Sequence, residues 1–237
     1  MPLQIGFLLF PQVQQLDLLG PYDVLAALPG VELHLIWKTL APVASSSGVA
    51  LTADATYASS PALDVICVPG GAGIADLMSD EETLDFIRRQ AAGARFVTSV
   101  CTGALLLGAA GLLRGRRATT HWAFHDLLAL LGALPVHERV VRDGMLITGG
   151  GITAGIDFAL VLAAELVGVE EAQAVQLELE YAPAPPFDAG SPLTAAPAVL
   201  ALVRQRNAAS VAQRRDIALR AAAALDGPLS FAVRDGS

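Results

Sequence analysis

The sequence predicts an α/β protein with a mostly parallel, doubly wound central sheet. Short apolar segments with the composition of buried strands alternate with helical segments through the first half of the chain, and this alternation is typical of such sheets. The hydrophobic fraction is 54% against a charged fraction of 16%, so the chain has enough apolar surface for a large core. Small aliphatic residues outnumber aromatic ones, which favours close packing of helices on a sheet.

Charge and cysteine content exclude several classes of protein. The formal net charge is −8, whereas general nucleic-acid binding requires a basic surface. The two cysteines, Cys67 and Cys101, have no disulfide or metal-ligand spacing, and reduced thiols indicate a cytoplasmic protein. The first ten residues lack the features of a signal peptide, and the longest uncharged apolar run, 104–113, is too short to span a membrane. We therefore expect neither a nucleic-acid partner nor a membrane partner.

The first strand is expected at Leu3–Phe10, which is almost wholly apolar, as in a strand buried on both faces. Apolar residues then recur at helical spacing from Leu18 to Leu28, and Pro21 suits a first helical turn. Asp17 is therefore expected in the loop just before this helix. A second strand is expected at Val31–Lys38, followed by a polar turn at Ala44–Gly48 and a short edge strand at Val49–Thr52.

The middle of the chain repeats the pattern of strand and helix. Strands are expected at Leu63–Val68 and Phe96–Val100, and helices at Ile74–Met78, Glu82–Ala92 and Thr102–Ala110. Asp17, the Gly70–Gly71 pair and Cys101 each follow directly on a strand. Because ligands bind beyond the carboxyl ends of the strands in such sheets, these residues are expected to meet at one edge.

The second half is expected to be mostly helical. The elements are a helix at His121–Leu131, a hairpin at Glu138–Thr148 turning at Asp143-Gly144, helices at Thr153–Val167 and Glu170–Tyr181, and an extended proline-rich segment at Ala182–Pro192. A final helix is expected at Ala195–Leu225, either continuous or broken near Asn207–Ser210. Its arginines, which fit a solvated face better than a site for an acidic partner, are Arg204, Arg206, Arg214, Arg215 and Arg220.

The junction at Cys101 leads to the central hypothesis. A sharp strand-to-helix turn holds the side chain out from the sheet, so we expect an exposed sulfur close to the first free N–H groups of the helix. Those groups and the helix dipole favour negative charge, which predicts a thiol that ionises readily and acts as a nucleophile. The alternative is a buried, inert cysteine, which is the interpretation that we favour for Cys67 in the middle of its strand.

From the sequence, each of the other candidate residues has two possible roles. Asp17 is either a general acid/base beside the thiol or an ordinary carboxylate at a helix N-terminus. Gly70 and Gly71 present N–H groups to a developing anion, satisfy a tight turn, or do both. The Gly149–Gly151 run, with Gly150 at its centre, lacks the Lys-Ser/Thr of a phosphate loop and favours a close backbone approach.

His121 and His125 are four residues apart on the expected helix. This spacing suits a metal ion, but the segment lacks the glutamate of a zinc protease motif and has no cysteine ligand nearby. We therefore expect no metal site. A Cys–His dyad that uses His121 remains an alternative, and so does capping of the helix by residues 119–121.

The resemblance to a known family rests on segments spread from the N-terminus to about Leu225. They are IGFLLFP, QQLDLLGP, DVICVPGG, VTSVCTGALLLGAAGLL, ATTHW, TGGGITAGIDFAL and YAPAPPF. Together they resemble the DJ-1/PfpI superfamily and, within it, the enzymes that hydrate isonitriles. The resemblance implies a flavodoxin-like sandwich of the class I glutamine amidotransferase type with helices on both faces. It also implies a homodimer that needs no metal and no organic cofactor.

The resemblance also implies a domain organisation. Residues 1–192 correspond to the α/β domain and residues 193–225 to a helical extension packed on that domain. Residues 226–237 have no counterpart in the family, and we expect them to form a flexible tail.

The roles that the resemblance implies centre on Cys101 as nucleophile, with Asp17 as its acid/base partner and Thr102 as a neighbouring polar contact. The resemblance also implies that Ile152 packs near the cysteine. The substrate and oxyanion pocket is expected to comprise Gly70, Gly71, Gly150 and Ile152. The implied activity is that of a hydro-lyase that converts an isonitrile and water into an N-substituted formamide through a covalent thioimidate.

Two residues differ from other branches of the superfamily. Protease-like and chaperone-like members usually have glutamate in the first loop, where this chain has Asp17, and protease-like members have histidine directly after the cysteine, where this chain has Thr102. Both differences weaken a peptidase, deglycase or glyoxalase interpretation. The alternatives that remain are a glyoxalase- or deglycase-like enzyme and a cysteine redox sensor. A transcription regulator of the AraC type would need a further DNA-binding region, for which the chain has no room after Leu193.

Overall fold

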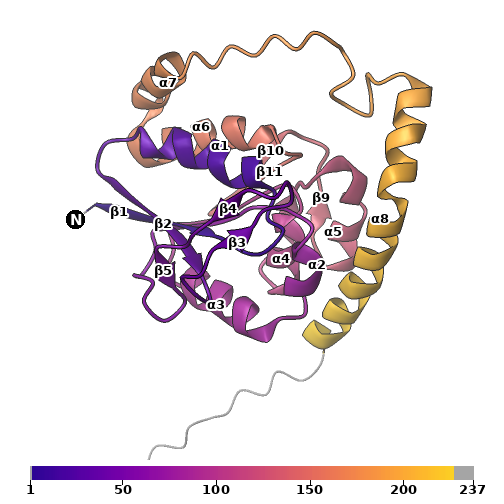
Figure 1. Cartoon of the computed structure of the whole chain (residues 1–237), viewed down its shortest axis with the longest axis horizontal. Helices are drawn as coiled ribbons and strands as arrows, with labels where there is room; N and C mark the ends of the chain where they lie inside the picture. The colour runs from indigo at the N-terminus through magenta and orange to yellow at the C-terminus, as the bar shows by residue number, and fades with distance from the viewer. Residues whose placement is uncertain (1, 227–237) are drawn as a thin grey trace, which may run out of the picture.

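A seven-stranded sheet forms the centre of the computed structural model, which describes residues 2–226 (Figure 1). Its strands are β1 (Leu3–Leu8), β2 (Val31–Trp37), β5 (Ala55–Thr56), β6 (Val65–Val68), β7 (Phe96–Val100), β10 (Val140–Asp143) and β11 (Leu146–Gly149). Across the sheet they lie in the order β10, β11, β7, β6, β1, β2, β5, and only β10 is antiparallel to its neighbour. Apart from the short β5 and the antiparallel β10, this is the flavodoxin-like order: second, first, third, fourth, fifth. The predicted mostly parallel sheet is confirmed.

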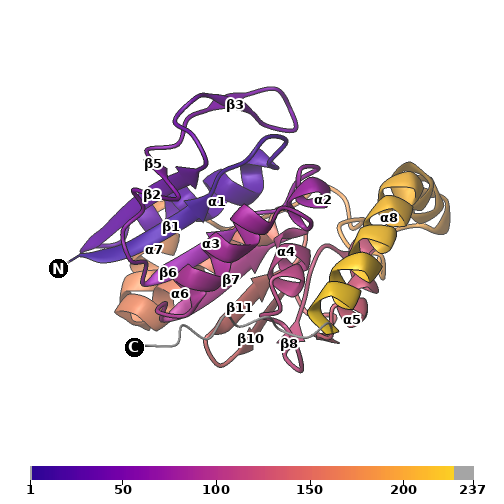
Figure 2. The ribbon, with the colours of Figure 1, turned by 90° about the horizontal axis from the view of Figure 1, so that it is seen from below.

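Helices cover both faces of this sheet (Figure 2). They are α1 (Gln15–Ala26), α2 (Ile74–Leu77), α3 (Glu81–Ala91), α4 (Gly103–Ala109), α5 (Leu127–Leu130), α6 (Ala154–Val167), α7 (Val169–Glu178) and α8 (Pro197–Asp226). α1 and α6 pack together on one face, and α3 and α4 pack on the other. α8 lies outside α4 and α5 and contacts both. Within residues 2–226, no helix combines the length and the apolar character needed to cross a membrane.

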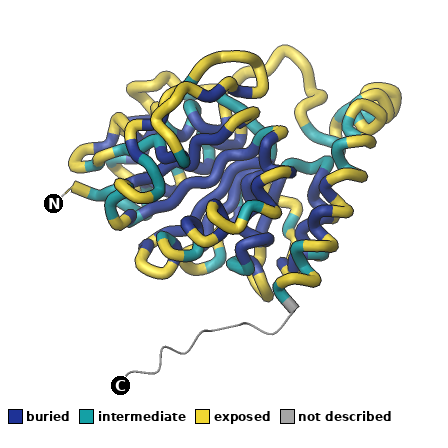
Figure 3. Tube along the Cα trace, turned by 60° about the horizontal axis from the view of Figure 1, so that its bottom comes forward, coloured by how far each residue is buried: buried dark blue, intermediate teal, exposed yellow. Residues whose placement is uncertain are grey.

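The central strands are buried along their whole length. Every residue of β6 and β7 is buried, because helices exclude water from both faces of the sheet. A strand in this position reads as a continuous apolar segment without polar alternation, and this explains why both strands were recognisable in the sequence. Figure 3 shows the buried strands at the centre and the exposed loops around them.

One expectation about local structure is wrong, one of two alternatives is excluded, and one expected strand pairs outside the central sheet. The expected helix at His121–Leu131 is a 3-10 turn, η1 (Trp122–Phe124), followed by the short α5, because the His121 side chain accepts the Ala123 N–H and starts a separate turn. The last helix is continuous through residues 207–210, so the broken alternative is wrong. The expected edge strand at Val49–Thr52 forms β4 (Ala50–Leu51), which pairs with β3 (Val43–Ala44) in a separate small sheet.

Two further short strands, β8 (Arg117–Ala118) and β9 (Leu134–Pro135), pair with each other and were not expected from the sequence. α8 ends at Asp226, and the other residues of the expected tail, 227–237, lie outside the described part of the chain.

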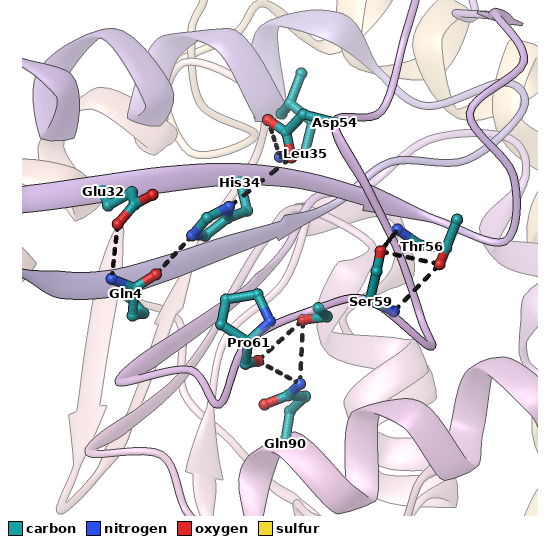
Figure 4. Close-up of polar contacts among 10 residues, drawn as sticks. Gln4, Glu32, His34, Leu35, Asp54, Thr56, Ser59, Pro61 and Gln90 are labelled. Atoms are coloured by element: carbon teal, nitrogen blue, oxygen red, sulfur yellow. Dashed lines mark hydrogen bonds and ion pairs between the residues drawn. The ribbon is translucent and has the colours of Figure 1, made fainter.

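Polar side chains connect the strands at the β5 edge of the sheet (Figure 4). Gln4 on β1 donates to Glu32 on β2 over 3.0 Å and lies 2.7 Å from the Nε2 atom of His34. The Asp54 carboxylate accepts the Leu35 N–H at 3.1 Å and so holds the segment that leads into β5. Gln90 on α3 donates to the Pro61 carbonyl over 3.0 Å. These contacts fix the edge farthest from β10.

α4 approaches β6 closely at Gly103, directly after the cysteine turn. A Cβ atom at this position would overlap the Val68 carbonyl oxygen and would lie 2.9 Å from the Pro69 oxygen. Both obstacles are backbone atoms, which cannot move aside as the end of a flexible side chain can. Glycine therefore permits the contact that places the helix N-terminus against the end of β6.

We predict that Gly103→Ala lowers the free energy of unfolding by at least about 2 kcal/mol, because the new methyl group collides with backbone. Urea denaturation followed by tryptophan fluorescence measures this change. Gly93→Ala is the matched control, since a Cβ there meets nothing within 4 Å, and it should change stability by less than about 0.5 kcal/mol. Equal stabilities for the two variants would contradict the close approach.

Candidate active site

The candidate residues gather at the carboxyl ends of four neighbouring strands, β1, β6, β7 and β11. The segment that follows each strand contributes at least one of them, as expected from the sequence. One difference concerns Asp17, which lies in the first turn of α1 and not in the loop before it. The residues brought together are Asp17, Gly70, Gly71, Cys101, Thr102, Gly150 and Ile152.

The backbone of Cys101 is in the left-handed region, with φ of 55°. A residue with a side chain rarely adopts this conformation unless its surroundings impose it. Here the Cys101 N–H donates to the carbonyls of Gly149 (3.1 Å) and Gly150 (2.9 Å), and its own carbonyl accepts the Thr120 hydroxyl at 2.7 Å. The predicted sharp turn is confirmed, and hydrogen bonds hold it on both sides of the cysteine.

Asp17 is fully buried, with 0% of its surface exposed. Its Oδ2 atom accepts the Gly70 N–H at 3.0 Å, while Oδ1 has no hydrogen bond of ordinary geometry among the described residues. The carboxyl group also interacts with the Cys101 thiol. Burial raises the pKa of Asp17 from 3.8 to about 7, against the opposing effects of Cys101 and the Gly70 N–H. A Cβ at position 70 would lie 2.6 Å from Oδ2, so this approach requires glycine.

Cys101 is only 6% exposed, so the expectation of an exposed sulfur is wrong. The expectation of a readily ionised thiol is also wrong for this environment. Burial raises the pKa of Cys101 well above 9.0, and the negative charge of Asp17 raises it further. The N–H groups of Thr102 and Ile152 bond to the sulfur and oppose this effect. The thiol therefore holds its proton at rest, beside a carboxyl group that can accept it.

The N–H groups of the turn after β6 are hydrogen-bonded to other atoms of the protein. Gly70 donates to Asp17, and Gly71 donates to the Thr102 hydroxyl at 3.1 Å, so neither points freely at a substrate. Gly150 likewise donates its N–H to the Arg139 carbonyl at 2.8 Å. The main-chain donors that face the sulfur are those of Thr102 and Ile152.

His121 lies near the site but is not the partner of the thiol. Its Nδ1 atom accepts the Ala123 N–H at 3.2 Å, and burial lowers its pKa, with a smaller contribution from the charge of Arg214. Cys101 interacts with the Asp17 carboxyl instead. Across residues 2–226, no three His, Cys, Asp or Glu side chains cluster in a way that could hold a metal ion.

Sequence reasoning missed Arg214. The interpretation as part of a solvated face is wrong for this residue, which is 5% exposed. Its Nη2 atom donates to the carbonyls of Gly71 (2.9 Å) and Ala72 (3.3 Å), next to the Asp17 and Thr102 contacts. One signal was available: Ile217 and Ala218, which are buried, follow it by three and four residues and so share its helix face.

Comparison with known proteins gives three findings. The profile of the DJ-1/PfpI family matches residues 4–165 of the chain. The isonitrile hydratase of Pseudomonas putida is 70% identical over 226 residues, which cover 95% of this chain and 99% of that protein. The crystal structure of a THiJ/PfpI family protein from Pseudomonas syringae has a TM-score of 0.90 at 42% identity, covering 92% of this chain and 91% of the other.

A further relative matches this chain over only about half of its own length. The HTH-type transcriptional regulator GbdR of Pseudomonas aeruginosa is 34% identical over 73% of this chain, and the match covers 49% of the regulator.

The burial of Asp17 predicts an unusual pH dependence of stability. The unfolded chain loses the Asp17 proton near pH 4 and the folded protein loses it near pH 7, so between these values the folded state binds more protons. Stability therefore falls as pH rises through this range. At about 1.4 kcal/mol per pKa unit, the ionised Asp17 carboxyl lowers the free energy of unfolding above pH 7 by on the order of a few kcal/mol.

We predict that Asp17→Asn removes this cost, so that the variant is more stable than the wild type at pH 8 and similar to it at pH 4. Urea denaturation at both pH values measures the difference. Asp23→Asn, an exposed change on the same helix, should alter stability by less than about 0.5 kcal/mol at either pH. An Asp17→Asn effect of the same size at pH 4 and pH 8 would show that the carboxyl has an ordinary pKa.

Proposed function

The chain belongs to the DJ-1/PfpI family, and on that premise we propose that it is an isonitrile hydratase. Such an enzyme adds water to R–N≡C and releases an N-substituted formamide. The observation that carries the proposal is the buried pair of Asp17 and Cys101, found in a chain so similar to the Pseudomonas putida enzyme over nearly its whole length. The pair supplies a nucleophile and a proton carrier side by side, as this hydration requires.

The proposed reaction begins when the Cys101 thiol passes its proton to the Asp17 carboxylate as sulfur attacks the terminal carbon of the isonitrile. The new C–S bond leaves an electron pair on that carbon, and the Asp17 carboxylic acid protonates it. The product is a thioimidate, R–N=CH–S–Cys101, with Asp17 ionised again. A pKa of about 7 suits Asp17 to both transfers, because the group can then take or give a proton near neutrality.

Water completes the reaction. Asp17 takes a proton from a water molecule whose oxygen attacks the thioimidate carbon, and the resulting acid protonates the nitrogen. The C–S bond then breaks, the hydroxyl proton returns through Asp17 to the sulfur, and R–NH–CHO leaves. The N–H groups of Thr102 and Ile152 stabilise the negative charge on the departing sulfur. This scheme uses no metal and no organic cofactor.

The surroundings of the pair support an uncharged substrate with a narrow reactive end. Cys101 is nearly buried and Asp17 fully so, which leaves little space beside the sulfur. The –N≡C group is linear and carries no net charge, so it enters such a site without the desolvation cost of an ion. Restricted access also limits competing reactions of the intermediate.

The two alternative functions receive less support. A cysteine that senses peroxide is typically exposed and has a low pKa, whereas Cys101 is buried and its pKa is raised. A glyoxalase- or deglycase-like enzyme would act on reactive carbonyl compounds such as methylglyoxal. Asp17 and Thr102 occupy positions where those branches of the superfamily differ, so the same two residues favour isonitrile hydration.

We further propose a two-part organisation of the chain and a cytoplasmic location. Residues 1–192 form the α/β domain in this proposal, and residues 193–225 form an extension, supported by the contacts of α8 with α4 and α5. We place the protein in the cytoplasm, where the catalytic thiol stays reduced.

We also propose that two copies form a homodimer. The segment between α7 and α8 arches away from the body of the molecule (Figure 1), and it and its flanks expose large apolar side chains that a monomer would leave in water. They are Leu177 (82% exposed), Phe187 (78%) and Leu193 (92%).

Turnover of two substrates distinguishes isonitrile hydration from a glyoxalase- or deglycase-like activity. Purified protein should convert an alkyl isonitrile to the N-alkylformamide and leave methylglyoxal unchanged. Cys101→Ala should reduce formamide formation at least about a thousand-fold, because the nucleophile is lost. Cys67→Ala, which removes the chain's other cysteine, should retain most activity. Undiminished formamide production by Cys101→Ala, or turnover of methylglyoxal alone, would refute the proposal.

A homodimer has twice the molecular mass of the single chain in solution. Light scattering should give about twice the chain mass of 24.5 kDa for the wild type. Phe187→Asp should shift the equilibrium toward monomer, since a charge in an apolar interface is costly. Leu40→Asp, which alters an exposed apolar residue elsewhere, should leave the dimer intact. A wild-type protein that is monomeric at all concentrations would contradict the dimer.

A further inference from the structure

α8 brings a buried positive charge to the catalytic edge of the sheet. Arg214 is 5% exposed, and no carboxylate in the part of the chain that the structure describes forms an ion pair with its guanidinium. An unpaired buried charge is strongly destabilising, so a residue of this kind needs an explanation. α8 lies outside the 4–165 range that the family profile matches, so the charge comes from an element beyond the shared domain.

The contacts of Arg214 fix its position. Nη2 donates to the carbonyls of Gly71 and Ala72, and Nη1 donates to the Ser210 hydroxyl. The guanidinium stacks over the Phe124 ring, 4.7 Å from its centroid. Nε is buried and has no hydrogen-bond partner among the described residues. These contacts hold the side chain in one place, but they do not neutralise its charge.

This position is next to the turn that contacts Thr102, the residue after the thiol. The Gly71 carbonyl that Arg214 binds belongs to the residue whose N–H donates to Thr102, which follows Cys101. The charges of Arg214 and Cys101 interact, and Arg214 also acts on His121. The titratable groups that meet here are therefore Asp17 from α1, His121 from the start of η1, Cys101 from the β7 turn and Arg214 from α8.

We propose that Arg214 is a positioning residue for the nucleophile: its fixed positive charge favours the thiolate of Cys101 while its hydrogen bonds hold the turn at residues 70–72. When the thiol passes its proton to Asp17, the sulfur acquires a negative charge in a buried site. His121 remains neutral because burial lowers its pKa, so the guanidinium supplies the compensating charge. The inference rests on the proposed role of Cys101.

The test compares variants that separate charge from hydrogen bonding. Arg214→Gln keeps a donor for the turn but removes the charge, whereas Arg214→Lys keeps the charge but loses the planar fork. The rate of alkylation of Cys101 by iodoacetamide is measured against pH in the Cys67→Ala background, so that one thiol is followed. Alkylation needs no isonitrile turnover, so it tests Arg214 even if the proposed substrate is wrong.

In the Gln variant, the alkylation profile should move to higher pH by about one unit or more, the usual effect of losing a neighbouring opposite charge. Alkylation at pH 7 should be about ten-fold slower. The Lys variant should stay closer to the wild type than the Gln variant does. Arg215→Gln, an exposed neighbour on the same helix, should leave the profile unchanged. With isonitrile, the Gln variant should lose kcat and kcat/KM to a similar extent.

The His121 pKa and a citrulline variant test the charge of Arg214 independently of Arg214→Gln alkylation. The His121 pKa, followed by NMR of the imidazole, should rise in the Gln variant, because the charge that helps to lower it is gone. If Arg214→Gln does not fold, semisynthesis with citrulline at position 214 preserves the shape without the charge, and it should shift the alkylation profile in the same direction. A neutral variant with a wild-type profile, or equal shifts in the Lys and neutral variants, would overturn the proposal.

Discussion

The burial of one carboxyl group beside one thiol is the constraint on which the rest of this site depends. Asp17 has no exposed surface, and its pKa rises to about 7 because the charged form is poorly solvated there. The neighbouring backbone is arranged to tolerate this group: Gly70 donates its N–H and has no Cβ that would collide with the carboxyl. A carboxyl that titrates near neutrality is suited to deprotonating a thiol and returning the proton to carbon, which is the role that we propose for Asp17.

In the proposed mechanism, the Cys101 thiol is activated by its partners and not by exposure to solvent. The left-handed backbone at Cys101 aims the side chain at Asp17 and at two main-chain N–H groups, while burial keeps the proton on sulfur until a base accepts it. This arrangement suits a nucleophile that is activated only with the substrate in place. It also protects the thiol from the oxidation to which exposed, ionised cysteines are prone.

Sequence patterns predicted the parts of the molecule that follow local rules. The strands β6 and β7 were recognisable because strands buried on both faces are continuously apolar, and the meeting of Asp17 with Cys101 followed from the geometry of parallel sheets. Two-residue strands such as β8 have no periodicity to detect. The inward position of Arg214 depends on the packing of α8, which follows the cysteine by about a hundred residues and whose packing no local pattern specifies.

The most direct test of this account is a titration of the Asp17 carboxyl in the folded wild-type protein, by NMR with isotope-labelled aspartate and with Asp17→Asn to assign the signal. The account predicts a midpoint near pH 7, with the protonated acid still populated at neutrality. A midpoint near pH 4, the value of an ordinary aspartate, would leave Asp17 ionised throughout the working range and would contradict its role as proton carrier.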